Sequence, residues 1–527
     1  MPMAATSRTG DLWNRRLGFW HLAEDHPEAL AVAESPDGEF TYAALAALAH
    51  QTVHALRSWG LPDGATVAVL APNGILPIQM SLACQQSGWC LLLVNGYLTA
   101  NEVIDILEHS GASVLVLHQH HRDLLDNENG QRIHQLCHVL GVGEVPGTTP
   151  LEDLVAQQPT CAPDHRTTGN MIVYSSGTTG APKGILRPLG GRDPNEALNA
   201  MAVFGQAFDF RPFDGPHLVS TAMYHGGSHT YYMGALNVGH ALVIMARFDA
   251  ESALELIDRH QVRTAYMVAT QFYRLLHLPE QTRSKYSVTS LHSVVHSAAP
   301  CPQPLKRAML EWWGPVIWET YGGMEGAATI AKPHRWLEKP GTVGRAVRGV
   351  KLAIFDDAGN QLGPNETGHI YFKTESGFSY HRDEELTAEV HRGDMFTIGD
   401  VGYLDEDGYL FIQDRAKDMI ISGGVNIYPA EIEAVLLQHN AVLDAAVIGI
   451  PDEDWGEAVL AIIELRQGHE PSELLEEELL GYCREHLAAH KRPRRVEFRS
   501  DLPRTDAGKL YKRVIRDEYW AGASRRV

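Results

Sequence analysis

The sequence predicts an α/β fold: a large N-terminal domain of layered α/β subdomains with a small β-barrel region, followed by a small α+β C-terminal domain. Three observations predict this class. Strand-like and helix-like segments alternate through the first half, short alternating strands with turn residues follow, and a compact α+β pattern begins near Asp418. We place the boundary between residues 1–414 and residues 415–527.

In the first half, apolar runs rich in β-branched residues predict strands, and the longer segments between them predict helices. The predicted strands cover residues 67–70, 90–94, 113–117, 263–268 and 293–299. The predicted helices cover residues 75–84, 100–107 and 250–260. Strands joined through helices are typical of parallel α/β layers.

The character of the chain changes between Lys351 and Phe372, where turn signals at residues 356–360 and 363–365 separate short strands. This predicts the small all-β region. Farther on, the predicted elements are helices 430–438 and 472–487 and strands 441–450 and 458–465. Residues 126–150 have weak periodicity and predict no element.

Composition restricts the class of protein. The 527 residues suggest about three to four domain-sized units, and 44% hydrophobic with 21% charged residues is typical of a soluble globular protein. A formal charge of -21 argues against a nucleic-acid or anionic-membrane surface. Six cysteines without a C-x-x-C pair predict neither a disulfide framework nor a zinc site. Without an apolar leader or a membrane-length apolar run, we expect a cytoplasmic protein with no membrane span.

The run from Tyr174 to Gly184 (YSSGTTGAPKG) carries hydroxyls, glycines and Lys183, which together can hold a polyphosphate. Apolar residues 171–173 precede it and residues 184–186 follow it, so we expect a loop between two strands. The Walker pattern, which opens a helix, does not occur here. A flexible surface hairpin is the alternative, and the Pro-Lys-Gly ending disfavours it.

Further segments follow in a set order over nearly the whole chain. They are residues 296–300 (HSAAP), 318–325 (WETYGGME), 397–403 (TIGDVGY), 414–418 (DRAKD), 422–429 (SGGVNIYP) and 502–509 (LPRTDAGK). With the loop, they resemble the adenylate-forming superfamily of acyl-CoA synthetases, adenylation domains and luciferases, and most of all a bacterial acyl-CoA ligase. The resemblance implies that ATP converts a carboxylic acid to acyl-AMP with release of pyrophosphate, and that the thiol of coenzyme A then displaces AMP.

The resemblance implies the nucleotide site. The residues expected to bind ATP or AMP are Ser175, Ser176, Gly177, Thr178, Thr179, Gly180, Lys183, Ala298, Ala299, Pro300, Glu319, Thr320, Tyr321, Gly322, Met324, Asp400 and Arg415. Tyr321 would pack on the adenine, Asp400 would accept both ribose hydroxyls, and Arg415 would contact ribose and phosphate. Glu325 would hold Mg²⁺, for which one carboxylate beside phosphate oxygens suffices.

The resemblance also implies a mobile C-terminal domain that serves the two half-reactions in turn. Lys509 would be catalytic in adenylation, because carboxylate and α-phosphate repel each other until a cation lies between them. The domain would then rotate about a hinge, for which Lys417 is our prediction. Ser422, Gly423 and Gly424 would then line the thiol channel.

For the acyl pocket, the resemblance implies the residues Tyr224, His225, Gly226, Gly322 and Gly323. His225 would border the carboxylate and count among the catalytic residues with Glu325 and Lys509. A packing role is the alternative for this histidine. The surroundings of His225 are neutral, with no aspartate to pair with an α-ammonium, which favours a plain carboxylic acid.

Two positions depart from the family pattern. Met324 stands where a serine or threonine hydroxyl usually meets the α-phosphate, and methionine offers no useful donor. Arg187-Pro188-Leu189 replaces the usual Thr-His after the loop. This sequence is similar to that of ligases that act on bulky terpenoid- or steroid-like acids. A neighbouring group would have to substitute for the missing hydroxyl, or the adenylation step would be slower.

Other functions stay open at this point. A stand-alone adenylating enzyme could load the phosphopantetheine of a separate acyl carrier protein instead of CoA. Luciferase-like oxygenation is a further alternative, because luciferases share the same motifs. A nucleotide-binding protein without enzymatic activity is the last alternative, and only Met324 supports it. The sequence leaves the identity of the acid and the existence of a homo-oligomer open.

Overall fold

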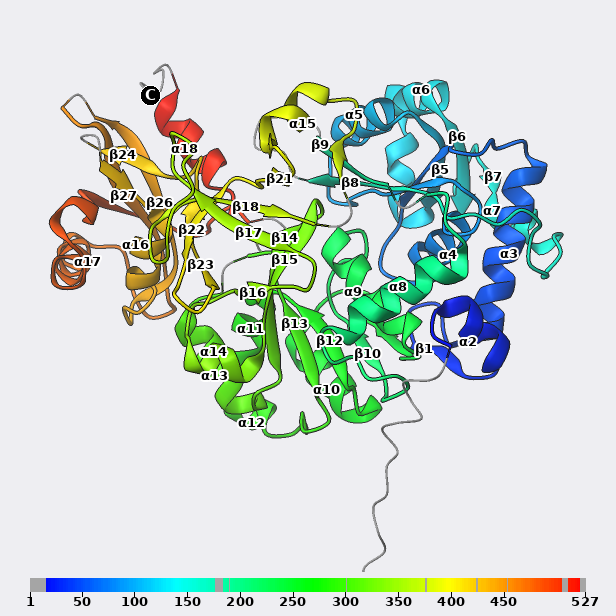
Figure 1. Cartoon of the computed structure of the whole chain (residues 1–527), viewed down its shortest axis with the longest axis horizontal. Coiled ribbons are helices and arrows are strands. Elements are labelled where there is room, and N and C mark those ends of the chain that lie inside the picture. Colours follow the sequence, from blue (N-terminus) through cyan, green and yellow to red (C-terminus); the bar gives the residue numbers. More distant parts are fainter. Residues whose placement is uncertain are drawn as a thin grey trace, which may run out of the picture.

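The computed structural model describes residues 16–175, 183–188, 190–299, 301–374, 377–422, 425–452, 454–504 and 510–521. Its strands form an N-terminal sheet, a long central sheet and a small C-terminal sheet (Figure 1). Helices cover the faces of these sheets, and many neighbouring strands of the first two run parallel. The predicted α/β class is confirmed.

The N-terminal sheet has the strand order β19-β9-β8-β4-β3-β5-β6-β7. In that order the strands are Ser379–Tyr380, Lys183–Arg187, Met171–Ser175, Cys90–Leu93, Thr66–Leu70, Ala112–His118, His138–Val142 and Thr149–Pro150. Strands β8, β4, β3, β5 and β6 run parallel, whereas β8 and β9 are antiparallel. Every residue of β3 is buried, as a parallel strand with helices on both faces requires.

The central sheet has the order β2-β1-β11-β10-β12-β13-β14-β15-β16-β23-β22-β18-β21-β20, and β17 pairs with β18. The parallel part comprises β1 Leu30–Glu34, β11 Leu242–Ile244, β10 His217–Val219, β12 Thr264–Met267, β13 Ser293–His296 and β14 Ile317–Gly323, with β2 Phe40–Thr41 antiparallel at its edge. The remaining strands are β15 Gly326–Ala331, β16 Gly344–Ala346, β17 Lys351–Phe355, β18 Gly368–Lys373, β20 His391–Arg392, β21 Met395–Phe396, β22 Asp400–Leu404 and β23 Tyr409–Arg415. The predicted small β region therefore continues the central sheet through β15 and β16.

Helices α3 (Tyr42–Ser58) and α4 (Ile75–Cys84) lie between the two large sheets. Leu45 of α3 belongs to the core against the central sheet, and Val53 belongs to the core against the N-terminal sheet. Helix α4 divides its apolar side chains between the same two cores, so it is buried on nearly every side. A helix without a polar face fits this position.

The other helices cover the outer faces. Helices α5 (Ala100–Ser110) and α6 (Asn127–Leu136) pack on the far face of the N-terminal sheet. Helices α2 (Phe19–Asp25), α8 (Pro194–Gln206) and α9 (Gly226–Asn237) share the inner face of the central sheet with α3, while α10 (Ala250–His260), α11 (Ala269–Leu276) and α13 (Gln303–Trp313) cover its outer face. Shorter helices are η1 (Gln119–Leu125), α7 (Leu151–Ala156), α12 (Glu280–Arg283), α14 (Pro333–Glu338) and α15 (Glu384–Val390).

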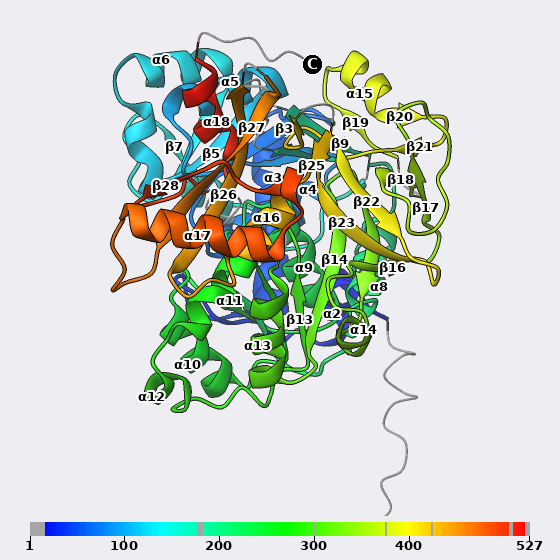
Figure 2. The same cartoon turned by 90° about the vertical axis from the view of Figure 1, so that its left-hand side faces the viewer.

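The C-terminal unit lies at one end of the molecule, on the left in Figure 1 and toward the viewer in Figure 2. Its sheet has the order β25-β24-β27-β26, with β28 beside β27. The elements are β24 Ile420–Ser422, β25 Val425–Ile427, α16 Pro429–Leu436, β26 Val442–Asp452, β27 Gly456–Leu465, α17 Glu473–His486, η2 Ala489–Lys491, β28 Arg495–Arg499 and α18 Lys512–Trp520. Helices α16 and α17 pack on one face of the sheet and α18 on the other, as predicted for an α+β unit.

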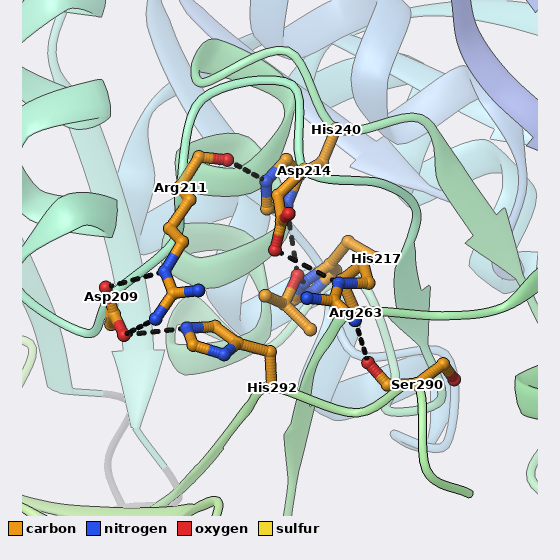
Figure 3. Close-up of polar contacts among 9 residues, drawn as sticks. Asp209, Arg211, Asp214, His217, His240, Arg263, Ser290 and His292 are labelled. Carbon is orange, nitrogen blue, oxygen red and sulfur yellow. Dashed lines mark hydrogen bonds and ion pairs between the residues drawn. The ribbon is translucent and has the colours of Figure 1, made fainter. Parts of the chain in front are cut away.

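A polar network closes the amino edge of the central sheet, where β10, β12 and β13 begin (Figure 3). Arg263 donates from Nε to Asp214 at 3.0 Å and from Nη1 to the Ser290 carbonyl at 2.8 Å. Asp209 accepts from Arg211 at 3.0 Å and from His292 at 2.6 Å. Each charged group in this network therefore has a partner.

The Thr264 hydroxyl joins two buried histidines in the same network. Nε2 of His240 lies 2.7 Å from the Arg211 carbonyl, which can only accept, so Nε2 carries the proton. Burial lowers the pKa of His240 to about 4, so its Nδ1 is a bare acceptor to which the Thr264 hydroxyl donates at 3.1 Å. The hydroxyl oxygen then accepts from Nδ1 of His217 at 2.9 Å, and burial likewise lowers the pKa of His217.

Most predicted elements are present. Helices α4 and α10 have the predicted bounds, and β8 and β9 are the two strands expected beside the loop. Strand β13 ends at His296 instead of residue 299, because Ala298 takes a left-handed φ of 75° that ends the strand. Residues 126–150 hold α6, β6 and β7. In the part of the chain that is described, no helix is long and apolar enough to cross a membrane.

Candidate active site

The predicted site residues gather at the carboxyl edge of the central sheet, opposite the network at its amino edge. Parallel strands β10, β12, β13 and β14 end here, and ligands of open α/β sheets bind at this edge. Ala298 and Ala299 follow β13 directly. The left-handed φ of Ala298 stores backbone strain of about 1–3 kcal/mol, which is typical of a functional site.

Met324 and Glu325 form the two-residue turn of the hairpin between β14 and β15. Gly323 pairs with Gly326 across this turn. A Cβ on Gly323 would lie 2.2 Å from a carboxylate oxygen of Glu325, so any larger residue here would displace the carboxylate from this position. A Cβ on Gly322 would meet the Gly326 carbonyl at 2.3 Å. The hairpin thus fixes the expected metal ligand on a short, tight support.

Glu325 is half-buried and lies near charges of both signs. Burial raises the pKa of its carboxyl, while a hydrogen bond from the Tyr380 hydroxyl at 3.2 Å and the charge of Arg415 oppose this rise. Among the described residues, no group of three or more carboxylate, histidine or cysteine side chains is placed to hold a metal ion. A single half-buried carboxylate fits Mg²⁺ that takes its other ligands from phosphates and water.

Asp400 and Arg415 lie opposite each other on neighbouring strands. Asp400 begins β22, Arg415 ends β23, and their Cα atoms are partners in the antiparallel register. The Nε of Arg415 is 3.5 Å from the Asp400 carboxylate. Burial and the charge of Asp400 raise the pKa of Tyr321, whose ring packs on Phe372 with centroids 6.2 Å apart. The three residues predicted to hold the nucleoside are therefore neighbours.

Lys417 adds a second cation to this group. It lies in the turn between β23 and β24, and its carbonyl accepts a hydrogen bond from Arg516 at 3.0 Å. Burial lowers the pKa of Lys417 to about 8, and the charges of Arg415 and Lys183 contribute to this lowering. Lys183, at the start of β9, thus approaches the same site. The hinge role of Lys417 stays a prediction.

The predicted acyl-pocket residues lie around the start of α9. His225 is the residue before the helix, its ring lies 4.4 Å from that of Tyr224, and burial lowers the pKa of His225 to about 4. A neutral imidazole suits a neighbour of the acid. A Cβ on Gly226 would lie 2.3 Å from Sδ of Met324, so this glycine makes room for the methionine.

One predicted nucleotide ligand uses its side chain elsewhere. The Glu319 carboxylate accepts from Nζ of Lys306 at 2.5 Å and lies 3.9 Å from His296, and Lys306 is fully buried on α13. Glu319 therefore points into the outer core of the central sheet, and only its backbone is left for a ligand. Thr320, one residue on, donates its hydroxyl to the Thr329 carbonyl at 2.8 Å.

Other predicted residues cannot be placed fully. Ser176, Gly177, Thr178, Thr179, Gly180, Pro300, Gly423, Gly424 and Lys509 lie outside the described residues. Ser175 ends β8 opposite Lys183, and Ser422 ends β24 opposite Val425. Tyr380, which donates to Glu325, belongs to no sequence motif, and no motif assigns Arg187 a role in binding.

The chain matches family models and relatives over most of its length. A family model described as AMP-binding enzyme matches residues 19–379, and one described as AMP-binding enzyme C-terminal domain matches residues 431–509. A 2-succinylbenzoate–CoA ligase from Geobacillus kaustophilus is 34% identical over 498 residues, which cover 93% of this chain and 95% of that protein. A fatty acid–[acyl-carrier-protein] ligase from Streptomyces coeruleorubidus is 31% identical over 494 residues, with coverage of 92% and 93%.

A solved structure shows the same fold. The o-succinylbenzoate CoA synthetase from Bacillus subtilis, in complex with its acyl-adenylate intermediate, aligns with a TM-score of 0.80 and 26% identity. The alignment covers 95% of this chain and 98% of that chain. None of these three names refers to a terpenoid or steroid acid, so the expectation drawn from Arg187-Pro188-Leu189 is not supported.

Proposed function

Because the chain belongs to the AMP-binding enzyme family, an adenylate-forming family of ligases, we propose that it is an acyl-CoA synthetase. It activates a carboxylic acid with ATP as acyl-AMP, releases pyrophosphate, and transfers the acyl group to coenzyme A. The observation that carries the proposal is that Asp400 lies opposite Arg415, that the charge of Arg415 acts on Glu325, and that the charges of Arg415 and Lys183 both act on Lys417, although these residues come from segments far apart in the sequence.

Each group has a task in this reaction. Asp400 accepts the ribose hydroxyls, Tyr321 packs beside the adenine, and Arg415 contacts ribose and phosphate. Glu325 would hold Mg²⁺, which supplies positive charge to the phosphates. Lys509 stabilises the negative charge that develops as the acid attacks the α-phosphate and pyrophosphate leaves.

Coenzyme A is the acceptor that we propose, since one reported relative is named a CoA ligase and the solved structure is named a CoA synthetase. A carrier-protein phosphopantetheine is the second candidate, because the Streptomyces relative is named an acyl-carrier-protein ligase. Both acceptors present the same thiol. The acid that we propose is a plain carboxylic acid, since burial keeps His225 neutral and the sequence around it carries no aspartate to pair with an α-ammonium.

The test is release of pyrophosphate with a panel of fatty, aryl and dicarboxylic acids, 2-succinylbenzoate among them, with and without CoA. We expect acyl-CoA to form with at least one class of acid. If pyrophosphate is released but free CoA is never acylated, the result supports a carrier-protein phosphopantetheine as the acceptor. If no acid causes release in either condition, the proposed function fails.

A second test separates the half-reactions. The Lys509→Ala variant should lose adenylate formation by about 10²–10³-fold, yet still make thioester from supplied acyl-AMP, because the adenylate is already activated. Equal loss of both half-reactions would contradict a lysine that serves adenylation only. Thermal unfolding of the variant serves as the folding control.

A further inference from the structure

Two neighbouring strands of the central sheet end beside the expected adenine site. Strands β13 and β14 run parallel, and His296 lies opposite Glu319 in their register. Beyond these two residues the chain continues into residues 298–300 and residues 320–321, the two segments that we expect to contact adenine. The position of one segment relative to the other therefore decides how well the base is held.

A buried ion pair connects the stretches of chain that carry these two segments. Nζ of Lys306 donates to the Glu319 carboxylate at 2.5 Å. Lys306 lies in the first turn of α13, which begins at Gln303, three residues after the first segment. Glu319 directly precedes the second segment on β14. The ion pair thus links α13 to β14 at the place where each adjoins an expected adenine contact.

Apolar side chains surround this ion pair. Lys306 is 0% exposed and Glu319 is 8% exposed. Nζ of Lys306 lies 4.7 Å from the centroid of the Trp336 ring, and Met309 and Leu310 of α13 belong to the same core as Trp336. Glu319 is the one carboxylate within ion-pair distance of Lys306 among the described residues. Each charge therefore depends on the other for its position.

His296 lies beside the pair on β13. Its Nε2 is 3.9 Å from the Glu319 carboxylate. Burial lowers the pKa of His296 to about 4, so the ring is neutral near pH 7. His296 therefore adds no charge, and Lys306 is the cation that balances Glu319.

A buried ion pair of this kind adds little to stability. The removal of two charges from water costs about as much free energy as their attraction returns, and apolar side chains of similar volume are often as stable. A charge-assisted hydrogen bond differs from an apolar contact because it fixes a distance and a direction. The location of the pair, next to two expected ligand contacts, therefore favours a role in positioning.

The backbone at Ala298 gives an independent reason. Its φ of 75° is left-handed, which is unfavourable for a residue with a side chain. Such a conformation persists only where the surrounding structure fixes the chain. Strand β13 fixes the chain before Ala298, and α13, linked to β14 through Lys306, fixes it afterwards. The ion pair therefore helps to hold this strained segment in place.

We propose that Lys306 and Glu319 are positioning residues for the nucleotide. Their ion pair fixes residues 298–300 relative to residues 320–321, and so sets the affinity for the adenine of ATP. Neither side chain touches the reacting atoms, and both act through the backbone. This inference rests on the proposed function, because it concerns the ATP of the same reaction.

Two double variants separate positioning from stability. Lys306→Met with Glu319→Leu fills the space without a directional bond, whereas Lys306→Gln with Glu319→Gln removes both charges and keeps a hydrogen bond. The Met/Leu variant should be at least as stable as the wild type. It should bind ATP about 10-fold more weakly, because groups that orient ligand contacts are typically worth this factor or more. The Gln/Gln variant should bind ATP more tightly than the Met/Leu variant.

The measurements are calorimetric titration of the full-length chain with ATP and Mg²⁺, and urea unfolding of the same samples. In turnover, the KM for ATP should rise by the same factor, while kcat and the KM for the acid stay unchanged, because the lost interaction acts equally on ground state and transition state. Arg263→Met with Asp214→Leu is the matched control. It replaces an ion pair at the amino edge of the same sheet and should leave the affinity for ATP unchanged.

Each result decides the question. Wild-type affinity for ATP in a stable Met/Leu variant overturns the proposal, and so does a fall in kcat at unchanged ATP affinity. A Met/Leu variant that does not fold also overturns it, because the pair would then serve the fold itself. If the wild type binds ATP but no acid releases pyrophosphate, the proposed function fails, while the calorimetric comparison still tests the positioning role. A wild type that does not bind ATP overturns both.

Discussion

Two arginines show how differently this fold uses charge. Arg263 at the amino edge of the central sheet is matched by a carboxylate and a carbonyl, so its charge holds the ends of the strands together. Arg187, at the end of β9, has no ion pair among the described residues, and Glu325 is the opposing charge that acts on it. Paired charge thus holds the amino edge of the central sheet together, whereas Arg187 is held without a described ion pair.

The largest expected effect comes from Glu325→Gln at the functional edge. The loss of the carboxylate should slow adenylate formation by about 10²–10³-fold, because the charge at the phosphates is no longer stabilised. The free energy of unfolding should stay the same or rise, since burial opposes the charged carboxylate. Pyrophosphate release and urea unfolding measure the two effects. A large loss of stability would contradict the distinction between the edges.

Thr264→Val tests the structural edge. The change removes the hydroxyl that donates to His240 and accepts from His217, and leaves two buried ring nitrogens without a partner. We expect a loss of about 1–3 kcal/mol in the free energy of unfolding. The kcat should be unchanged at temperatures where the variant is folded. A drop in kcat without loss of stability would show that the two edges are coupled.

The same network predicts a pH effect. His240 has a folded-state pKa of about 4, below its ordinary value of 6.5, so it stays neutral in the fold but takes up a proton on unfolding. Its contribution to stability is complete above about pH 6.5 and is lost as the pH falls toward 4, by about 1.4 kcal/mol per pH unit. In His240→Gln, the slope of unfolding free energy between pH 6.5 and pH 4.5 should be smaller by that amount. An identical slope would show that His240 is protonated in the fold.

The smallest effect concerns stability at the functional edge. Arg187→Met replaces a half-buried cation, which has no ion pair among the described residues, with an apolar chain of similar length, and we expect a gain of about 1 kcal/mol in the free energy of unfolding. Arg263→Met should instead lose stability, because it leaves Asp214 without its partner. Urea unfolding of the two variants side by side checks the opposite signs. A loss in both would mean that Arg187 is structural.

Much of this architecture could be predicted from local sequence. Helix α10 has the predicted bounds because Asp249 caps its start and Gln261 ends it in a left-handed conformation. Asp400 and Arg415 are opposite each other in the register of β22 and β23, which agrees with the prediction that both residues bind the same nucleoside. These features depend on residues close in the chain or on a resemblance in the order of motifs.

The rest depends on long-range packing. Nothing in the sequence beside Glu319 shows that Lys306 on α13 will be its partner, and that ion pair removes its side chain from the predicted site. Strand β13 ends early because Ala298 is in a left-handed conformation, although the sequence of this segment predicts a strand. The sequence also does not show whether Arg187 has an ion-pair partner, because this depends on which side chains lie near it in the folded chain.

The shared position of α3 and α4 has a mechanical consequence. Each helix presents side chains to both large sheets at once, so one sheet cannot slide past the other without opening two cores together. Such interiors are stiff and resist gradual deformation. We therefore expect the body that carries Asp400 and Glu325 to stay rigid, and any large movement during a catalytic cycle to take place at the short link after β23.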